Sequence, residues 1–404
     1  MNVPRFNYPY LPQCKVSHAS IQHAVKLKLC TESLLSVPKS LIIDGVISYG
    51  GSTSIGLKLL YKSYGEFHER NHLFTRIPVD HQKKLNEVTP ASHREKLLSL
   101  CQLTDDAKKQ QALAHQFSFT TVHNLFDDSA RDYFYNAISL NGKKHDNKFI
   151  NFSDSCACAA HPQKDKALYN SLMEFVERQA LLGSWLSKTY QYTINPAILR
   201  EITPYTELVD LLMDNGELVI VQNGNQLPGH TVIIFYFSHS ADDLVQYSIG
   251  SSSGLTLEEA LLSSLEELYQ CYSFLYNSES SEGLEDKAGA GYHLEFQKCN
   301  RQSIRETIPF MQDLRPFQIN TMQDLQQLKI YTYEEVLDEL SSISKEIYYY
   351  HAYDAALKLH YTKIMSPDFF AHMSLNNKLN IENDYAKRLN ITTDNAFLGK
   401  IPFP

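Results

Sequence analysis

The sequence lacks the features that mark membrane, secreted and nucleic-acid-binding proteins. No stretch reaches about 18 consecutive apolar residues, the length that a membrane span requires. The start, MNVPRFNYPYLPQCK, has no basic segment followed by an apolar run, so it is not a secretory signal. No long run of Lys and Arg occurs, and the net charge is −9 at pH 7. We therefore expect neither nucleic acid nor an anionic membrane as a partner.

Cysteine is also scarce. Seven cysteines are spread along 404 residues, an odd number that fits a reducing compartment better than a disulfide framework. The expected location is the cytoplasm. Cys156 and Cys158 lie two apart, and a zinc site there would need two more ligands, one of which could be His161. Small residues filling a tight loop are the simpler interpretation.

Two signatures of cofactor binding are missing as well. The pattern GxxxxGK[ST] does not occur, which excludes a P-loop nucleotide site. The sequence also carries no flavin-binding signature. What it does contain is ordinary for a globular chain, with 43% hydrophobic and 21% charged residues.

Strand and helix patterns are interspersed along the chain. Apolar, β-branched runs predict strands at 41–48, 217–222 and 231–237, and alternation predicts strands within 345–365. Helices are predicted over about 57–72, 164–188 and 257–276, with a helical hairpin in 81–114. We predict an α+β (mixed α/β) fold. Because no clear linker divides the chain, we expect one catalytic core over 41–404 after an irregular segment 1–40.

An internal repeat is the most informative feature of the sequence. Residues 60–70 read LYKSYGEFHER and residues 168–178 read LYNSLMEFVER, which are identical at 7 of 11 positions. A weaker third copy, LSSLEELYQ at 262–270, keeps one Ser and one Glu and has Gln270 in place of the second Glu. A loop rich in small residues precedes each copy, at 49–56, 153–162 and 250–254.

The acids of the repeat are spaced to share one face of a helix. Glu66 and Glu69 are three residues apart, as are Glu174 and Glu177, and residues at this spacing are neighbours on a helix. Like charges there repel, but a hard cation such as Mg²⁺ reverses the sign of that interaction and also takes phosphate oxygens. The guanidinium groups that follow each pair are suited to phosphate. They belong to Arg70 and Arg178.

A structural explanation of the repeat stays open beside the functional one. The pattern ExxER is common on solvated helices, where Glu and Arg pair along the surface, and duplication alone could produce the likeness. Retention of both acids in both copies favours a function.

The three motifs, in this order, resemble the YcaO family. That family carries two ExxER-like helices and one ExxQ-like helix that hold magnesium and ATP. The resemblance implies a YcaO-type fold of β-sheets and helices that carry the three motifs. It implies Mg²⁺ ligands at Glu66, Glu69, Glu174 and Glu177. It further implies ATP contacts from Arg70, Arg178, Ser155, Glu267 and Gln270.

The C-terminal part extends the resemblance and narrows its implied function. The stretch YTKIMSPDFFAHM at 361–373 and the ending KIPFP look like the cyclodehydratase subunits of synthetases that install thiazoles and oxazoles. Such enzymes use ATP to cyclise Cys, Ser or Thr onto the preceding amide of a precursor peptide. The resemblance implies a catalytic terminal carboxylate at Pro404. It also implies two partners, a leader-peptide-binding subunit and an FMN-dependent azoline dehydrogenase.

Two other functions remain open from the sequence. One is a YcaO enzyme that makes thioamides or amidines. The other is a scaffold subunit without catalysis, against which the intact carboxylate pairs argue.

Overall fold

The computed structural model describes most of the chain in two compact units. Unit 1 comprises Met1–Tyr64, Lys188–Thr332 and Gly399–Pro404, and unit 2 comprises Gly65–Ser187 and Tyr333–Leu398. The described residues are 25–30, 37–45, 47–101, 103–223, 226–243, 245–278, 304–371, 373 and 379–399. Within the segment 1–40 they include one strand and the start of a second. The single catalytic core over 41–404 stays a prediction.

Unit 1 contains two antiparallel sheets. The first has the order β1 (Val25–Cys30), β2 (Lys39–Gly45), β3 (Tyr49–Ser54). The second has the order β11 (Tyr247–Gly254), β10 (His230–Ser238), β9 (Gly216–Gln222), β8 (Tyr192–Ile194). Its helices are α7 (Ile198–Ile202), α8 (Thr206–Asn215), α9 (Leu257–Ser278), α11 (Ile304–Thr307) and α12 (Met322–Gln326). A further helix, α2 (Gly56–Thr75), begins in unit 1 and ends in unit 2.

Helix α9 covers one face of the second sheet. Alternate residues of β10, Val232 and Ile234, point to this face and are buried against Leu261 and Leu265 of the helix. The helix lies so close to β11 that a Cβ on Gly250 would meet the backbone oxygen of Ser264 at 2.1 Å. Only glycine permits such an approach of backbone to backbone.

Replacing Gly250 by Ala is therefore expected to destabilise unit 1 by about 1–3 kcal/mol or more, because the added methyl group overpacks this contact. The free energy of unfolding, measured with urea, checks it. Gly65→Ala is the matched control, since a Cβ there would meet only the Ala160 carbonyl oxygen, at 3.6 Å. A Gly250→Ala variant as stable as the wild type would contradict the close packing.

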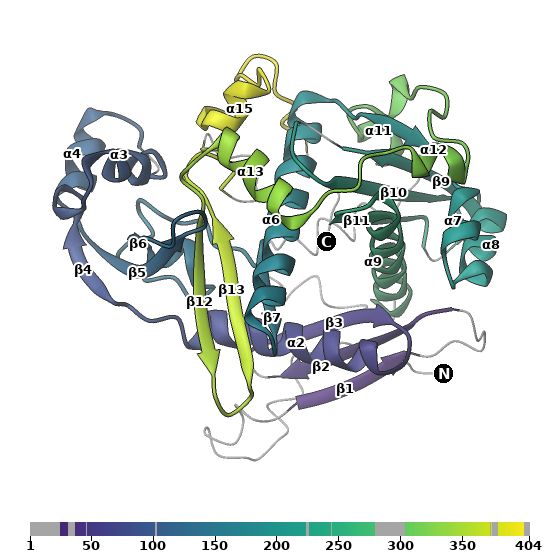
Figure 1. Cartoon of the computed structure of the whole chain (residues 1–404), viewed down its shortest axis with the longest axis horizontal. Coiled ribbons are helices and arrows are strands. Elements are labelled where there is room, and N and C mark those ends of the chain that lie inside the picture. Colours follow the sequence, from purple (N-terminus) through teal and green to yellow (C-terminus); the bar gives the residue numbers. More distant parts are fainter. Residues whose placement is uncertain are drawn as a thin grey trace. The chain divides into compact units, whose positions relative to one another are not determined.

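Unit 2 is built on one six-stranded antiparallel sheet. The order is β4 (His81–Lys84), β5 (Gln116–Asn124), β12 (Tyr348–Asp354), β13 (Leu359–Met365), β7 (Cys158–His161), and β6 (Ala130–Phe134) also pairs with β5. Strands β12 and β13 form the long yellow-green hairpin of Figure 1. The helices are α3 (Ala91–Ser99), α4 (Asp106–Ala114), α5 (Tyr135–Ile138), α6 (Lys164–Ser187), α13 (Tyr333–Ile343), α14 (Leu379–Glu382) and α15 (Asp384–Arg388).

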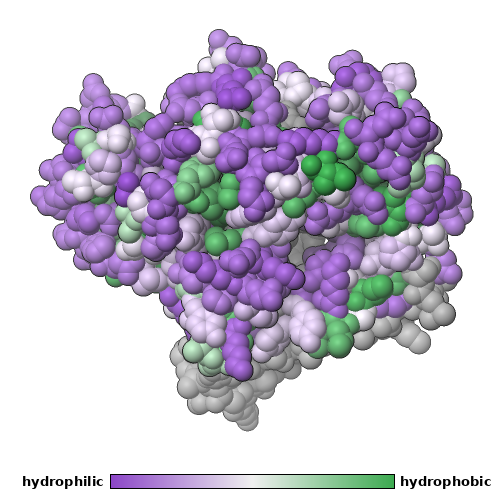
Figure 2. All heavy atoms as spheres, in the orientation of Figure 1, coloured by the Kyte–Doolittle hydropathy of each residue, from purple (hydrophilic) through white to green (hydrophobic). Residues whose placement is uncertain are grey.

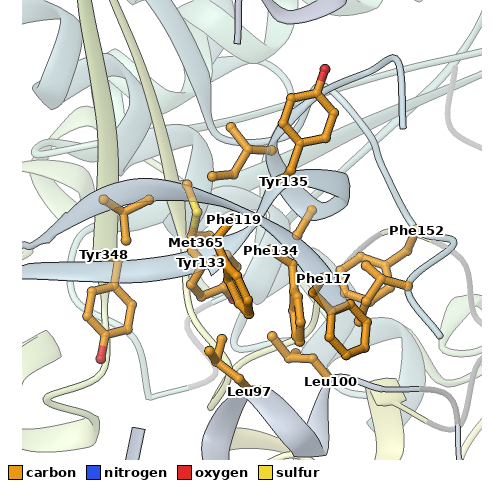
Figure 3. Close-up of a cluster of buried hydrophobic side chains, with 14 of the residues drawn as sticks. Leu97, Leu100, Phe117, Phe119, Tyr133, Phe134, Tyr135, Phe152, Tyr348 and Met365 are labelled. Carbon is orange, nitrogen blue, oxygen red and sulfur yellow. The ribbon is translucent and has the colours of Figure 1, made fainter. Parts of the chain in front are cut away.

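An aromatic cluster forms the core of unit 2 (Figure 3). Phe117 and Phe119 of β5 are fully buried against Phe134 of β6, with ring centroids 4.8 and 5.4 Å apart, respectively. Tyr348 brings β12 into the same cluster. Aromatic pairs at such distances add to the stabilisation that burial of their area provides. The long helix α6 packs along β13 and β7 and places its acidic residues beside this sheet.

The fold class predicted from the sequence is confirmed: helices and antiparallel sheets are mixed along the chain. Hydrophilic residues cover most of the face shown in Figure 2, and apolar residues gather there only in separate patches. Within the described ranges, none of the helices has the length and apolar character that crossing a membrane requires.

Candidate functional site

The first acidic pair lies on the part of α2 that belongs to unit 2. Glu66 accepts hydrogen bonds from Arg70, whose Nη2 and Nε atoms are 2.7 and 3.1 Å from the same carboxylate oxygen. The side chains of this ion pair are only partly exposed, at 26% for Glu66 and 20% for Arg70. The third residue of the motif, Glu69, lies between them in sequence.

The second acidic pair lies on α6. Arg178 Nη2 is 3.7 Å from a carboxylate oxygen of Glu174 and 3.6 Å from one of Glu177. Glu174 also accepts a hydrogen bond of 3.1 Å from the backbone N–H of Cys158 in β7. Glu177 is buried, with 6% of its surface exposed. The second copy is therefore not a solvated surface pattern.

The two pairs interact with each other within unit 2. Burial raises the pKa of Glu69 well above its usual value, and the nearby carboxylate of Glu174 raises it further, although Arg70 opposes the shift. Residues from two separate helices are thus close enough for their charges to repel. Such a surplus of buried negative charge is what a divalent cation relieves.

The donor set fits Mg²⁺ bound together with a phosphate rather than a closed metal cage. Among the described residues, no group of three or more His, Cys, Asp and Glu side chains is placed to hold a metal ion. Mg²⁺ usually takes one or two carboxylates and completes its shell with waters and substrate phosphates. Two arginines beside the acids are suited to the remaining phosphate charge.

The third motif lies in unit 1 and contacts strands there. Glu267 accepts a hydrogen bond of 2.9 Å from the backbone N–H of Ser251 in β11. Gln270 Nε2 is 3.4 Å from the backbone oxygen of Gly51 in β3. The structure thus brings the acids and arginines of the first two motifs together in unit 2 and the third motif next to two strands of unit 1. A nucleotide contact by the third motif stays a prediction.

The neighbouring acid, Glu266, is held by a separate network in unit 1. Tyr205 OH and Lys62 Nζ donate to its carboxylate at 2.6 and 2.9 Å, and Ser54 Oγ donates at 3.2 Å. Burial alone would raise the pKa of Glu266, but Lys62 and the Tyr205 hydrogen bond bring it below its usual value. Glu266 therefore stays ionised and ties α9 to the start of α2. Sequence analysis missed this role.

The structure says less about the other residues that the sequence singled out. Ser155 lies in the segment before β7 and is partly exposed. Pro404 lies outside the described residues. Burial raises the pKa of Cys156 and of Cys158 well above the usual value, so both thiols stay protonated. No metal-binding group includes them within the described part of the chain.

A pocket in unit 2 adjoins the second acidic motif. It encloses about 550 Å³, its open mouth included, between α6, β13 and the segment 152–157. Arg178 forms part of its wall, together with two charged residues that sequence analysis missed, Asp154 and Lys363. Lys363 is 3% exposed and donates a hydrogen bond to the backbone oxygen of Asp154. A lysine within the strand region predicted over 345–365 was the only sequence signal for it.

Comparison with known proteins identifies the class to which this site belongs. The family model described as YcaO cyclodehydratase, ATP- and Mg²⁺-binding, matches residues 61–369. The chain belongs to the YcaO cyclodehydratase family, as the resemblance of its motifs predicted, and it is an ATP- and Mg²⁺-dependent enzyme.

Particular relatives are similar over most of their length. The chain is 28% identical over 337 residues to the microcin B17-processing protein McbD of Escherichia coli. The aligned residues cover 81% of this chain and 83% of McbD. A chain of the E. coli microcin synthetase McbBCD complex matches with a TM-score of 0.82 and 26% identity, covering 94% of this chain and 96% of that one. YcaO from Methanopyrus kandleri, bound with AMPPCP and Mg²⁺, matches with a TM-score of 0.60, covering 87% and 88%. At 11% identity this last likeness shows the fold alone.

Proposed function

We propose that this chain is the cyclodehydratase subunit of a hetero-oligomeric synthetase, and that it converts Cys, Ser or Thr residues of a precursor peptide to thiazolines or oxazolines. The observation that carries the proposal is the pair of acidic helices in unit 2, each of which holds an arginine against its glutamates. The likeness to McbD supports the choice of reaction. The McbBCD complex with pro-MccB17 bound, at 26% identity and a TM-score of 0.80, supports a peptide substrate and partner subunits.

The reaction proceeds in three steps. The side-chain sulfur or oxygen of the cyclising residue bonds to the carbonyl carbon of the preceding amide, and the C=O π bond opens onto the oxygen. That oxygen takes the γ-phosphoryl group of ATP, and ADP leaves. Loss of phosphate and of the amide N–H proton then forms the C=N bond of the azoline. Positioning and charge neutralisation are the protein's main contributions to such a transfer.

The acidic and the basic residues of the motifs have different roles in this proposal. Glu66, Glu69, Glu174 and Glu177 would hold Mg²⁺, and the cation would neutralise negative charge on the phosphates. Arg70 and Arg178 now pair with these acids, and they are placed to exchange part of that pairing for phosphate oxygens. The other contacts to ATP come from Ser155, Glu267 and Gln270.

The proposal extends to parts of the system that lie beyond the described residues. The terminal carboxylate of Pro404 acts as the base for the cyclising side chain. One partner subunit binds the leader segment of the peptide, and an FMN-dependent dehydrogenase oxidises the azolines. The location of the assembly is the cytoplasm, where a reducing environment keeps substrate cysteines as thiols.

The test is to combine the purified synthetase with ATP, Mg²⁺ and the precursor peptide, and to weigh the product. An azoline-forming enzyme removes one water per ring and releases ADP and phosphate. A thioamide-forming enzyme replaces oxygen by sulfur. A synthetase in which this chain is only a scaffold keeps its ATP turnover and ring formation when the chain carries Glu174→Gln. Either of the last two outcomes would reject the proposal.

The third motif offers a separate prediction. Gln270→Ala should raise the dissociation constant of MgATP by about tenfold to a hundredfold, since hydrogen bonds to charged groups contribute about 1.5–3 kcal/mol. Isothermal titration calorimetry measures it. Glu258→Gln, an exposed position in the first turn of the same helix, is the control and should bind normally. A nucleotide-bound structure with the phosphates far from both Glu267 and Gln270 would refute the assignment.

A further inference from the structure

Lys363 is a buried cation that the reaction described above does not yet use. It lies on β13, pairs in register with Cys158 of β7, and is 3% exposed. Lysine is almost never fully buried unless it is paired, because removing an ammonium group from water is costly. The position therefore calls for a partner of negative charge or strong hydrogen-bonding capacity.

The described residues supply only some of the hydrogen-bond acceptors that the Lys363 ammonium group can use. An ammonium group has three N–H donors. Within the described part of the chain, only the backbone oxygen of Asp154 accepts a hydrogen bond from Lys363, and the nearest carboxylate oxygen of Asp154 is 3.9 Å away. Burial alone would lower the pKa of Lys363, but neighbouring groups, the carboxylates of Asp154 and Glu174 among them, raise it above the usual value. The Lys363 ammonium group is thus protonated, and more of its N–H donors are available than the protein uses.

The surroundings of Lys363 indicate what those donors receive. The residue lines the pocket of unit 2 together with Arg178. Phe175, Leu182 and Phe370 form apolar parts of the same wall. These apolar parts of the wall suit a peptide group with a small side chain, while Arg178 in the same wall is placed for a phosphate.

We propose that Lys363 is a catalytic residue that binds the carbonyl oxygen of the peptide group under attack and stabilises the oxyanion formed there. This inference rests on the proposed function. When the sulfur or oxygen nucleophile bonds to the carbonyl carbon, the π electrons move to the oxygen, and the proton of the nucleophile passes to a general base. Lys363 keeps its own proton and only donates a hydrogen bond. The oxygen then bonds to the γ-phosphorus as the bond to the bridging oxygen of ADP breaks.

The variant Lys363→Met tests this role, since it keeps the length of the side chain and removes the charge. Loss of one oxyanion donor lowers kcat by about 10²–10³-fold in other enzymes, and a similar loss is expected for ring formation. The dissociation constant of MgATP without peptide should stay unchanged. Lys363→Arg, which keeps a charged donor, should recover part of the rate. Lys358→Met, at an exposed position in the turn before the same strand, is the matched control.

The measurements are made on the assembled synthetase, with ring formation by mass spectrometry and nucleotide binding by calorimetry. Wild-type kcat in a folded Lys363→Met variant would overturn the inference. A matching loss of MgATP affinity would also overturn it, because the ammonium would then bind phosphate. If the Met variant does not fold, Lys363→Gln replaces it, and a stable Gln variant with wild-type kcat would count against the role. A wild-type synthetase that forms no rings would instead reject the proposed function.

Discussion

Replacing Glu174 or Glu177 by Gln is expected to lower ATP turnover by about 10²–10³-fold, while the fold is kept. Glutamine has the shape of glutamate but not its charge, so the cation loses a ligand and the phosphates lose their counter-charge. Glu177 is buried, and Glu174 contacts both Arg178 and Cys158, so the surrounding protein holds both carboxylates in place. Peptide-dependent release of phosphate and the dissociation constant of MgATP are the quantities to measure.

Glu258→Gln, on the exposed first turn of α9, serves as the control for loss of a glutamate charge. Wild-type ATP affinity in both Glu174→Gln and Glu177→Gln would contradict the assignment of the acidic motifs. Chelation of Mg²⁺ should remove nucleotide binding from the wild type in the same way.

The same electrostatics predict opposite effects on stability and activity at Glu69. Its carboxylate is buried near Glu174, so Glu69→Gln should raise the melting temperature in the absence of Mg²⁺ while it lowers turnover. Mg²⁺ and ATP together should then stabilise the wild type more than the variant, because only the wild type gains from the neutralised charge. A wild type that is at least as stable as the variant without Mg²⁺ would contradict this account.

Deletion of Phe403 and Pro404, or extension of the chain beyond Pro404, is expected to slow cyclisation by about 10²–10⁴-fold, the contribution typical of a positioned general base. The proposed role fits the two prolines of Ile401-Pro402-Phe403-Pro404, because proline fixes φ and lowers the entropic cost of holding a segment in one place. A free α-carboxylate has a pKa of about 3.3–3.7, so it is ionised at neutral pH and able to accept a proton.

ATP binding should be nearly unchanged in these C-terminal variants, which separates the role of the terminus from that of the acidic motifs. Adding the same residues at the N-terminus is the control for the effect of an extension. A C-terminally extended protein that makes azolines at the normal rate would show that the carboxylate has no catalytic role.

Local patterns in the sequence predicted most of the regular structure. The alternating and β-branched runs at 217–222, 231–237 and 345–365 are strands β9, β10, β12 and β13, and the three motif copies lie on helices α2, α6 and α9. The small-residue segments 49–56 and 250–254 were predicted as loops, which was wrong, because they form β3 and the end of β11. Small residues there carry little strand propensity. Only the structure explains the small residue at position 250, because helix α9 approaches the backbone of Gly250 closely.

The sequence by itself determined the spacing of the acidic motifs. A spacing of three places Glu66 near Glu69 and Glu174 near Glu177 in any helix, and the repeat predicts that both pairs share one function. Only the tertiary structure decided that Glu69 lies beside Glu174 and that Lys363 lines a pocket next to Arg178. Helical periodicity acts over one or two turns. Proximity between residues 174 and 363 depends on how α6 packs along β7 and β13, which no local pattern records.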